Sequence, residues 1–218
     1  MNDKIKIAIA DDHTLVCQTY ARALETDKRF KVVGTAENGK GLIDIIEKYK
    51  PDVILLDLQM PEMDGWATLD YIQENKIECK IIIVSMHLET TSIKDLTSKG
   101  VRGFLPKNTD FITLINAIHE VNNLGYFFDK KINLGIVKEL IAAKTINPTF
   151  KSIHLTEKEI QTLILICKDK LTKEIASDMH VTDRTIERYK THLYEKTRAK
   201  TSAGLLLFAL KNNYFDLT

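Results

Sequence analysis

A run of four apolar residues that ends at a carboxylate constrains the fold of this chain more than any other stretch: Val53–Leu56, followed by Asp57. Apolar residues on both faces are typical of a parallel strand buried within a sheet. In an open α/β sheet, sites lie beyond the carboxyl ends of the strands. The pattern therefore predicts a chemical site at Asp57, in a loop that Pro61 and the pair Asp64-Gly65 punctuate.

A second acidic cluster, Asp11-Asp12, follows another apolar strand, Ile5–Ala10. A charge buried without a partner is costly, and three carboxylates at neighbouring strand ends repel one another unless a cation lies among them. Oxygen ligands favour Mg²⁺, which keeps some of its waters and often bridges to a phosphate. The sequence therefore predicts a magnesium site that includes Asp11, Asp12 and Asp57.

Residues 1 to about 125 alternate strand-like and helix-like segments. The expected strands are Ile5–Ala10, Phe30–Ala36, Val53–Asp57, Lys80–Ser85 and Gly103–Pro106. The expected helices are Thr14–Glu25, Lys40–Lys48, Ala67–Glu74, Thr90–Ser98 and Asp110–Val121, the last with Ile112, Ile115 and Ile118 at helical spacing. This alternation predicts an α/β fold, a doubly wound five-stranded parallel sheet with helices on both faces.

The C-terminal part shows no convincing strand and predicts a small all-α domain. Thr156 and Glu159 fit a capping box that opens its first helix. We expect Thr172 to cap a helix at Lys173–Met179, His180-Val181 to form a turn, Thr182 to cap a helix to about Thr197, and Thr201–Asn212 to be a fourth helix. Two helices joined by a tight turn, the second with exposed basic residues, indicate a helix-turn-helix.

Length and composition are those of a globular chain with two domains. The chain has 218 residues, with 44% hydrophobic and 28% charged. No apolar run approaches the roughly 20 residues of a membrane helix, so we expect no membrane association. Three widely spaced cysteines indicate reduced thiols in a cytoplasmic protein. From Pro148 onward, 12 basic and 9 acidic residues give a net charge of +3, which permits nucleic-acid binding without showing it.

Two known families resemble the two parts. Residues 1 to about 125 resemble a response-regulator receiver domain, which is flavodoxin-like. The residues that carry this likeness are Asp11-Asp12, Asp57, Met60-Pro61, Asp64-Gly65, Ser85 and Lys107. Residues 153 to 214 resemble a LuxR/NarL-type helix-turn-helix domain through LTEKEI (155–160), LTKEIA (171–176) and VTDRTIERYKTHLYEK (181–196). The resemblance implies a receiver at 1–125, a helical linker at 126–152 and a DNA-binding domain at 153–218. Within the linker region, the sequence pattern itself favours one more helix at Asp129–Ala143, followed by a linker at Lys144–Ile153.

The receiver resemblance implies a role for each residue of the first site. Asp57 would be the phosphoacceptor, forming an acyl phosphate as aspartyl-phosphate enzymes do. Asp12, Asp57 and the backbone carbonyl of Gln59 would hold Mg²⁺, with Asp11 acting partly through water. Lys107 would be a fixed counter-charge to the phosphoryl group. The Ser85 hydroxyl would bond a phosphoryl oxygen, and Phe104 would occupy the aromatic switch position.

The second resemblance implies a face that binds DNA. Arg184, Glu187, Arg188 and Thr191 follow one stripe of the third helix, while Ile186, Tyr189 and Leu193 point inward. Arg188 is the first candidate for a guanine contact, and Glu187 for a cytosine contact. The residues expected to touch phosphates, which set register without carrying sequence information, are Lys173, Thr182, Thr185, Lys190 and Lys196.

The sequence departs from both families at several positions. Many receivers have Lys-Pro after the fifth strand, but here Lys107 precedes Asn108, which leaves the geometry of that peptide bond open. Arg198 replaces the usual glycine after the recognition helix, which could lengthen the helix or add a phosphate contact. Glu187 stands where lysine is frequent, Tyr189 where histidine is frequent, and Lys190 where an apolar residue is frequent.

These features predict a two-component response regulator. A sensor histidine kinase would phosphorylate Asp57, and the activated protein would bind double-stranded DNA as a homodimer, without acting as an enzyme. A phosphatase of the haloacid-dehalogenase type would need a second acid two residues after the nucleophile, and Gln59 argues against turnover. A phosphorylation-independent regulator, and C-terminal helices that bind a protein partner, stay open as alternatives.

Overall fold

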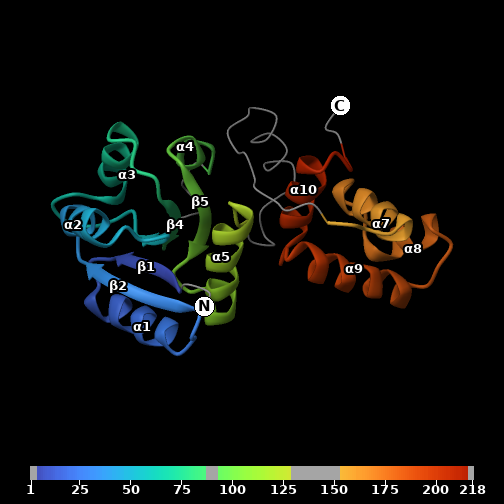
Figure 1. Ribbon diagram of the computed structural model, residues 1–218, viewed down its shortest axis with the longest axis horizontal. Coiled ribbons are helices and arrows are strands. Elements are labelled where there is room, and N and C mark those ends of the chain that lie inside the picture. The colour runs from blue at the N-terminus through green and yellow to red at the C-terminus, as the bar shows by residue number, and fades with distance from the viewer. Residues whose placement is uncertain (1–3, 87–92, 129–152, 216–218) are drawn as a thin grey trace. The chain divides into compact units, whose positions relative to one another are not determined.

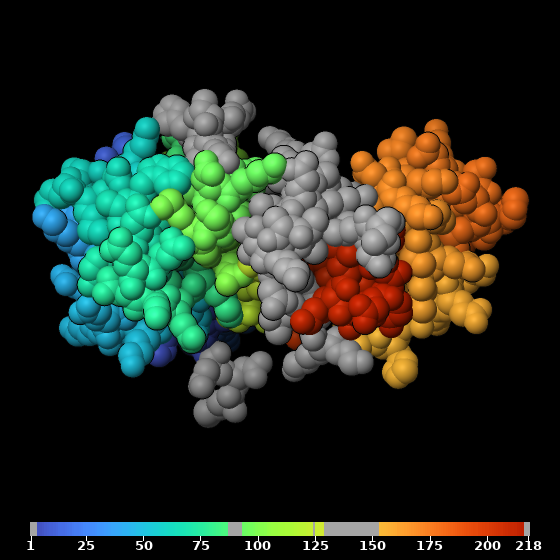
Figure 2. Space-filling view, turned by 90° about the horizontal axis from the view of Figure 1, so that it is seen from above, coloured from blue at the N-terminus to red at the C-terminus, as the bar shows by residue number. Residues whose placement is uncertain are grey.

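The computed structural model describes residues 4–86, 93–128 and 153–215. It divides into two compact units between Asn122 and Asn123, each described here by itself. In the space-filling view, the blue-to-green residues of the first unit lie together, and so do the orange-to-red residues of the second (Figure 2). The helix expected at 129–143, most of the linker up to 152 and the start of the helix expected at Thr90–Ser98 lie outside the described residues.

Five parallel strands form the sheet of the first unit (Figure 1). The strands are β1 (Ile5–Ala10), β2 (Phe30–Ala36), β3 (Val53–Leu56), β4 (Lys80–Ser85) and β5 (Val101–Pro106), in the order β2-β1-β3-β4-β5. After β2 the chain returns past β1 to place β3 on its other side, so the strand order reverses between β1 and β3. The predicted doubly wound parallel sheet is confirmed, and ligands bind such sheets where the order reverses.

Helices cover both faces of this sheet. They are α1 (Thr14–Glu25), α2 (Gly39–Tyr49), α3 (Gly65–Glu74), α4 (Ile93–Ser98) and α5 (Phe111–Leu124). Figure 1 shows α1 on one face and α2 and α3 on the other. The central strands are therefore covered on both sides, and every residue of Ile7–Ala10 and Val53–Leu56 is buried. The uninterrupted apolar run before Asp57 follows from this double cover.

Side-chain caps explain where several helices begin. The Asp64 carboxylate accepts a hydrogen bond from Ala67 N at 2.8 Å, so α3 begins at Gly65, two residues before the expected start. Asn38 caps α2 in the same way and starts it at Gly39. Of the three isoleucines at helical spacing in α5, Ile118 is buried, Ile115 is half-buried and Ile112 is 72% exposed. The buried face consists of Leu114, Ala117, Ile118 and Val121.

The second unit contains four described helices: α7 (Glu157–Cys167), α8 (Thr172–Asp178), α9 (Asp183–Thr197) and α10 (Ser202–Lys211). The predicted capping box is confirmed, since Thr156 Oγ1 accepts from Glu159 N and the Glu159 carboxylate accepts from Thr156 N. Thr182 caps α9 and Thr201 precedes and caps α10. The core of the unit includes Leu163, Ile175, Ile186, Leu193 and Phe208.

The structure decides three local points that the sequence predicted wrongly or left open: the start of α8, the end of α9 and the peptide bond after Lys107. Thr172 does not cap α8, because the helix begins at Thr172 itself and Leu171 occupies the capping position. Arg198 does not lengthen α9. Its left-handed backbone, with φ of 60°, ends the helix after Thr197. The described residues contain no cis peptide bond, so the bond between Lys107 and Asn108 is trans.

Within the described ranges, none of the helices combines the length and the apolar character that crossing a bilayer requires.

Candidate functional sites

The first candidate site is built where β1 and β3 end side by side. Ala10 and Leu56 are partners in register, so Asp11 and Asp57 each lie one residue beyond a paired strand end. Asp57 N donates a hydrogen bond to Ala10 O at 2.9 Å, which ties the two loops together. The side chains of both aspartates are 4% exposed. Strand order therefore brings two buried carboxylates together.

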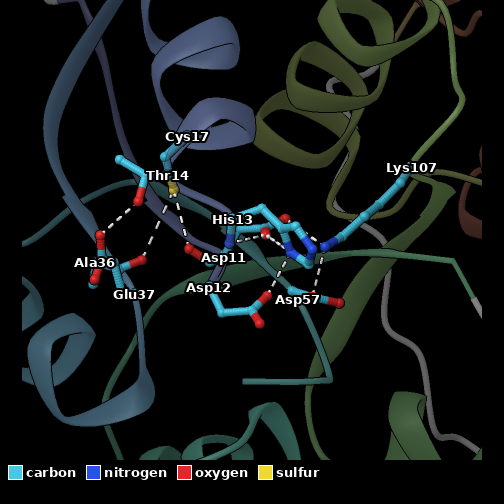
Figure 3. Close-up of polar contacts among 9 residues, drawn as sticks. All are labelled: Asp11, Asp12, His13, Thr14, Cys17, Ala36, Glu37, Asp57 and Lys107. Atoms are coloured by element: carbon cyan, nitrogen blue, oxygen red, sulfur yellow. Dashed lines mark hydrogen bonds and ion pairs between the residues drawn. The ribbon is translucent and has the colours of Figure 1, made fainter. Parts of the chain in front are cut away.

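Lys107 bridges the two carboxylates (Figure 3). Its Nζ atom lies 2.7 Å from Asp11 Oδ2 and 2.7 Å from Asp57 Oδ2. Burial on its own lowers the pKa of Lys107, but the hydrogen bonds to Asp11 and Asp57 outweigh it and raise the pKa above its ordinary value. The ammonium group therefore stays charged at neutral pH and offsets one of the buried negative charges.

The backbone on each side of the cluster is anchored to neighbouring elements. Lys107 N donates to Ser85 O at 3.1 Å, and the Tyr20 hydroxyl from α1 donates to Lys107 O at 3.3 Å. Cys17 Sγ donates to Asp11 O at 3.4 Å. Burial raises the pKa of the Cys17 thiol to about 11, so it is protonated and able to donate. These contacts hold the backbone behind Lys107 and Asp11.

His13 is a member of this cluster that sequence reasoning missed. Its Nδ1 atom lies 2.7 Å from Asp12 Oδ1, and its backbone N donates to Asp11 Oδ1 at 2.9 Å (Figure 3). Potential ligand atoms of Asp11, Asp12 and His13 lie within 4.8 Å of one another. The one available signal was that His13 directly follows the two aspartates. Imidazole suits softer metals better than Mg²⁺, so we interpret His13 as a hydrogen-bond partner of the carboxylates.

The donor set matches a hard divalent cation. The cluster contains three carboxylates, those of Asp11, Asp12 and Asp57, and one ammonium group, that of Lys107, which contacts Asp11 and Asp57. When all are ionised, two negative charges stay uncompensated, and carboxylate oxygens are the ligands that Mg²⁺ prefers. Asp12 and Gln59 line the same hollow in the surface, together with Met60, Pro61, Asp64 and Trp66. Coordination through the Gln59 carbonyl stays a prediction.

Gly65 lets the loop after β3 fold back against the site. A Cβ atom at this position would lie 2.4 Å from Asp57 O and 2.7 Å from Leu58 Cα, and both are backbone atoms that cannot move aside cheaply. Gly65 N donates to Leu58 O at 3.0 Å, closing the loop. The glycine of the Asp64-Gly65 pair is therefore required by close backbone approach.

Ser85 and Phe104, the predicted switch residues, are both buried and lie on neighbouring strands. Ser85 ends β4 opposite Pro106, which places it beside Lys107. Phe104 lies within β5, opposite Ile83. Ser85 thus lies next to the cluster, whereas the switch role of both residues stays a prediction.

The second candidate site is the outward face of α9. Arg184, Glu187, Arg188 and Thr191 are all exposed, whereas Ile186 and Leu193 are fully buried and Tyr189 is partly buried. The guanidinium of Arg188 lies 5.8 Å from the centre of the Tyr189 ring. The structure thus places the predicted stripe on one accessible face of a helix.

The residues expected to touch phosphates fall into two groups. In the first group, Lys173 is exposed. The hydroxyl groups of Thr182 and Thr185 form a hydrogen bond with each other at 3.0 Å, at the start of α9. The other two lysines carry intramolecular contacts, because Lys190 Nζ lies 3.0 Å from Glu187 Oε1 and Lys196 Nζ lies 2.7 Å from Glu159 Oε2. A lysine already paired with a carboxylate has less charge to offer a phosphate, so these two contacts stay predictions.

Comparisons with known families match both units. Residues 7–119 match the family model described as "Response regulator receiver domain". Residues 154–209 match the model described as "Bacterial regulatory proteins, luxR family".

Individual relatives support the same assignment. The oxygen regulatory protein NreC of Staphylococcus aureus (strain JH9) is 32% identical over 216 residues, covering 97% of this chain and all of NreC. The receiver domain of the putative response regulator NarL from Mycobacterium tuberculosis is 28% identical, with a TM-score of 0.52, covering 55% of this chain and 97% of that chain. RcsB from Salmonella enterica serovar Typhimurium, solved on a promoter with a phosphomimetic, is 24% identical, with a TM-score of 0.53, covering 95% and 99%. That last likeness shows the fold alone.

Proposed function

Because this chain belongs to the response regulators that join a receiver domain to a LuxR-type DNA-binding domain, we propose that phosphorylation of Asp57 controls its binding to DNA. The family regulates transcription. The observation that carries the proposal is the buried pair Asp11 and Asp57, bridged by Lys107 at two adjacent strand ends. Domain limits at 1–125, 126–152 and 153–218 belong to the same proposal.

The phosphoryl donor would be a phosphohistidine of a sensor histidine kinase. A carboxylate oxygen of Asp57 attacks phosphorus, an O–P bond forms, and the N–P bond of the donor breaks with its electrons returning to the imidazole. Asp11, Asp12, Asp57 and Gln59 would hold Mg²⁺, which when bound offsets charge on the transferring oxygens. Lys107 would then pair with the new phosphoryl oxygens, exchanging one anionic partner for another.

The consequence of phosphorylation would be dimerisation on DNA. The added charge and acceptor oxygens lie beside Ser85, whose hydroxyl would donate to them and shift the neighbouring β5 residue Phe104. A single helix-turn-helix binds a short half-site weakly, whereas two linked copies gain effective concentration on paired half-sites. RcsB, which shares the fold, has been solved as dimers on DNA.

The face of α9 would enter the major groove. Arg188 would grip guanine O6 and N7 with two hydrogen bonds, and Arg184, Glu187 and Thr191 would lie beside it. Lys173, Thr182 and Thr185 would contact phosphates. Arg198, exposed at the end of α9, can add another such contact.

We further infer that the protein stores the phosphoryl group rather than turning it over as an enzyme, because Gln59 stands where a phosphatase needs a second acid. We place it in the cytoplasm, since its three cysteines are free thiols.

Selection of double-stranded DNA with and without acetyl phosphate and Mg²⁺ tests the proposal. The wild type should gain one phosphoryl group, measured by intact mass, and bind a paired-site motif more tightly. Asp57→Asn should lose both effects because an amide cannot form an acyl phosphate. Asp44→Asn, at an exposed position of α2, is the matched control and should behave as the wild type.

Other outcomes separate the alternatives. Labelling that persists in Asp57→Asn would move the phosphoacceptor elsewhere. Equal DNA binding with and without phosphodonor would indicate phosphorylation-independent regulation. Absence of DNA binding in every state would favour C-terminal helices that bind a protein.

A further inference from the structure

Three side chains close a ring of hydrogen bonds where α8 meets α9. The Thr172 hydroxyl donates to Glu187 Oε1 at 2.9 Å. Lys190 Nζ donates to the same Glu187 Oε1 at 3.0 Å and to Thr172 Oγ1 at 3.1 Å. Each residue therefore contacts both others. Two of the three belong to the recognition helix, and the third is the first residue of the helix before it.

The ring fixes the charge state and the position of Glu187. Its hydrogen bonds with Lys190 and then Thr172 lower the pKa of Glu187, so the carboxylate is ionised at neutral pH and can only accept hydrogen bonds. The Glu187 side chain is 59% exposed, whereas that of Lys190 is 24% exposed. The carboxylate therefore faces outward, and the ammonium group that compensates it lies more deeply.

Both donors of the ring use one carboxylate oxygen, Oε1. Among the described residues, none donates a hydrogen bond to Glu187 Oε2. An ionised acceptor with an open oxygen is thus held on the same face of α9 as Arg184, Arg188 and Thr191. Holding it in advance reduces the side-chain freedom that would be lost on binding.

We propose that Thr172 and Lys190 are positioning residues that hold Glu187 so that it accepts a hydrogen bond from the N4 amino group of a cytosine. In the major groove, guanine presents acceptors at O6 and N7 and thymine presents O4, and all three repel a carboxylate. Adenine presents a donor next to an acceptor, which a carboxylate cannot satisfy. Cytosine presents the amino donor, so an acceptor at this position selects it.

This assignment changes the role of Lys190. As a phosphate contact it would release a counterion, but in the ring its charge neutralises Glu187 within the protein. A carboxylate without that compensation would repel the DNA backbone. The two departures from the family pattern, at positions 187 and 190, therefore form one ion pair. The inference rests on the proposed function, because it requires α9 to enter the major groove.

The first test exchanges the acceptor. Glutamine both donates and accepts, which matches adenine N6 and N7. In selections with phosphorylated full-length protein, Glu187→Gln should exchange a cytosine preference for adenine at one position of each half-site, on the order of tenfold in relative affinity. The preference for guanine at the base pair that Arg188 is proposed to contact should not change.

The second test separates positioning from structure. Thr172→Val keeps the shape of the side chain but removes the hydroxyl, and should reduce the cytosine preference severalfold while the rest of the motif persists. Thr172→Ser restores the hydroxyl and should restore the preference. A structural role alone would weaken binding to all sequences alike, without rescue of the base preference by serine.

The third test uses salt dependence. Lys190→Ala should reduce the cytosine preference, whereas loss of a phosphate contact alone would lower the slope of log K against log salt concentration and keep that preference. Lys173→Ala is the matched control, since this exposed lysine should lower the magnitude of that slope by about 0.9 without changing the motif.

The inference is overturned if Lys190→Ala lowers the salt slope and keeps the cytosine preference, because Lys190 would then contact phosphate. It is also overturned if the selected motif is unchanged in Glu187→Gln. If the phosphorylated wild type binds no double-stranded DNA, the proposed function fails first, which distinguishes the two failures.

Discussion

The two candidate sites place their charged residues in opposite environments. In the receiver, Asp11, Asp57 and Lys107 are almost completely buried and pair with one another. On α9, Arg184 and Arg188 are exposed. Buried charges must satisfy one another, so their geometry is fixed and the loss of one member leaves others uncompensated. Exposed charges stay solvated until a ligand arrives, so each contributes separately.

The second unit also contains a buried charge, at a position outside its candidate site. Glu159 is buried and accepts from Thr156 N and from Lys196 Nζ, the latter at 2.7 Å. Burial raises the pKa of Glu159, but the bonds from Lys196 and Thr156 outweigh it and lower the pKa overall. This carboxylate joins α7 to α9, far in sequence from the exposed stripe. Burial of charge therefore accompanies a fixed geometry in both units.

The largest effect on stability should come from Lys107→Ala. Two buried carboxylates lose their shared cation, which should lower the free energy of unfolding of the receiver by roughly 3–5 kcal/mol. Trp66, the single tryptophan, lies in this unit, so its fluorescence in a denaturant titration reports the change. Lys31→Ala, at an exposed position of β2, is the control. A loss below about 1 kcal/mol would contradict the interpretation of burial.

The pH dependence of this effect has a definite sign. The folded pKa of Lys107 is raised above its unfolded value, so its stabilisation is fully present below about pH 10 and is lost as pH rises through the folded pKa. The difference between wild type and Lys107→Ala should therefore be constant near neutrality and shrink only in strong alkali.

Glu159→Gln should lower the free energy of unfolding by a smaller amount, about 2 kcal/mol. The charge is lost, but the amide can keep part of the hydrogen bonding. The lowered pKa of Glu159 stabilises the fold above about pH 4.5, and this stabilisation is lost as pH falls through the folded pKa. The variant should therefore show a flatter acid dependence, measured by hydrogen exchange of the α7 amides. Glu195→Gln, exposed on α9, should change neither quantity.

Arg188→Ala should leave stability unchanged within about 0.5 kcal/mol, because the side chain is exposed. Its cost should appear in DNA binding instead, at roughly 1–3 kcal/mol on the best site, with relaxed preference at one base. Fluorescence anisotropy with a labelled duplex measures the affinity, and Lys168→Ala, exposed beyond α7, is the control. An unchanged motif would show that Arg188 is not a base contact.

The smallest effect should come from an exposed ion pair in the receiver itself. Lys40 Nζ lies 3.3 Å from Glu62 Oε2, and both side chains are largely exposed. Lys40→Ala should cost at most about 1 kcal/mol, and less at high salt. Trp66 fluorescence again measures it. A cost comparable to that of Lys107→Ala would show that burial does not explain the difference between the two lysines.

The sequence by itself determined the features that depend on near neighbours. Apolar runs and helical spacing located the strands and helices, and the placement of Asp57 after a buried run located the first site. Thr156 and Thr182 were identifiable as helix caps because a cap bonds residues two or three positions away. Thr201 was expected as the first residue of its helix, but the structure shows that it caps α10. The expectation for Thr172 failed because Leu171 offered no polar side chain to mark the true start of α8.

Only the tertiary structure decided which charged side chains meet. Lys107 reaches Asp57 across 50 residues of sequence, Lys196 reaches Glu159 across 37, and Thr172 reaches Glu187 across 15. These contacts depend on strand order and helix packing, which bring together residues that no local period relates. Hydrophobic periodicity states which side of an element is buried. It does not state which neighbouring element that side will contact. The contacts of Lys107 with Asp11, of Lys190 with Thr172 and of Lys196 with Glu159 therefore emerged only from the assembled fold.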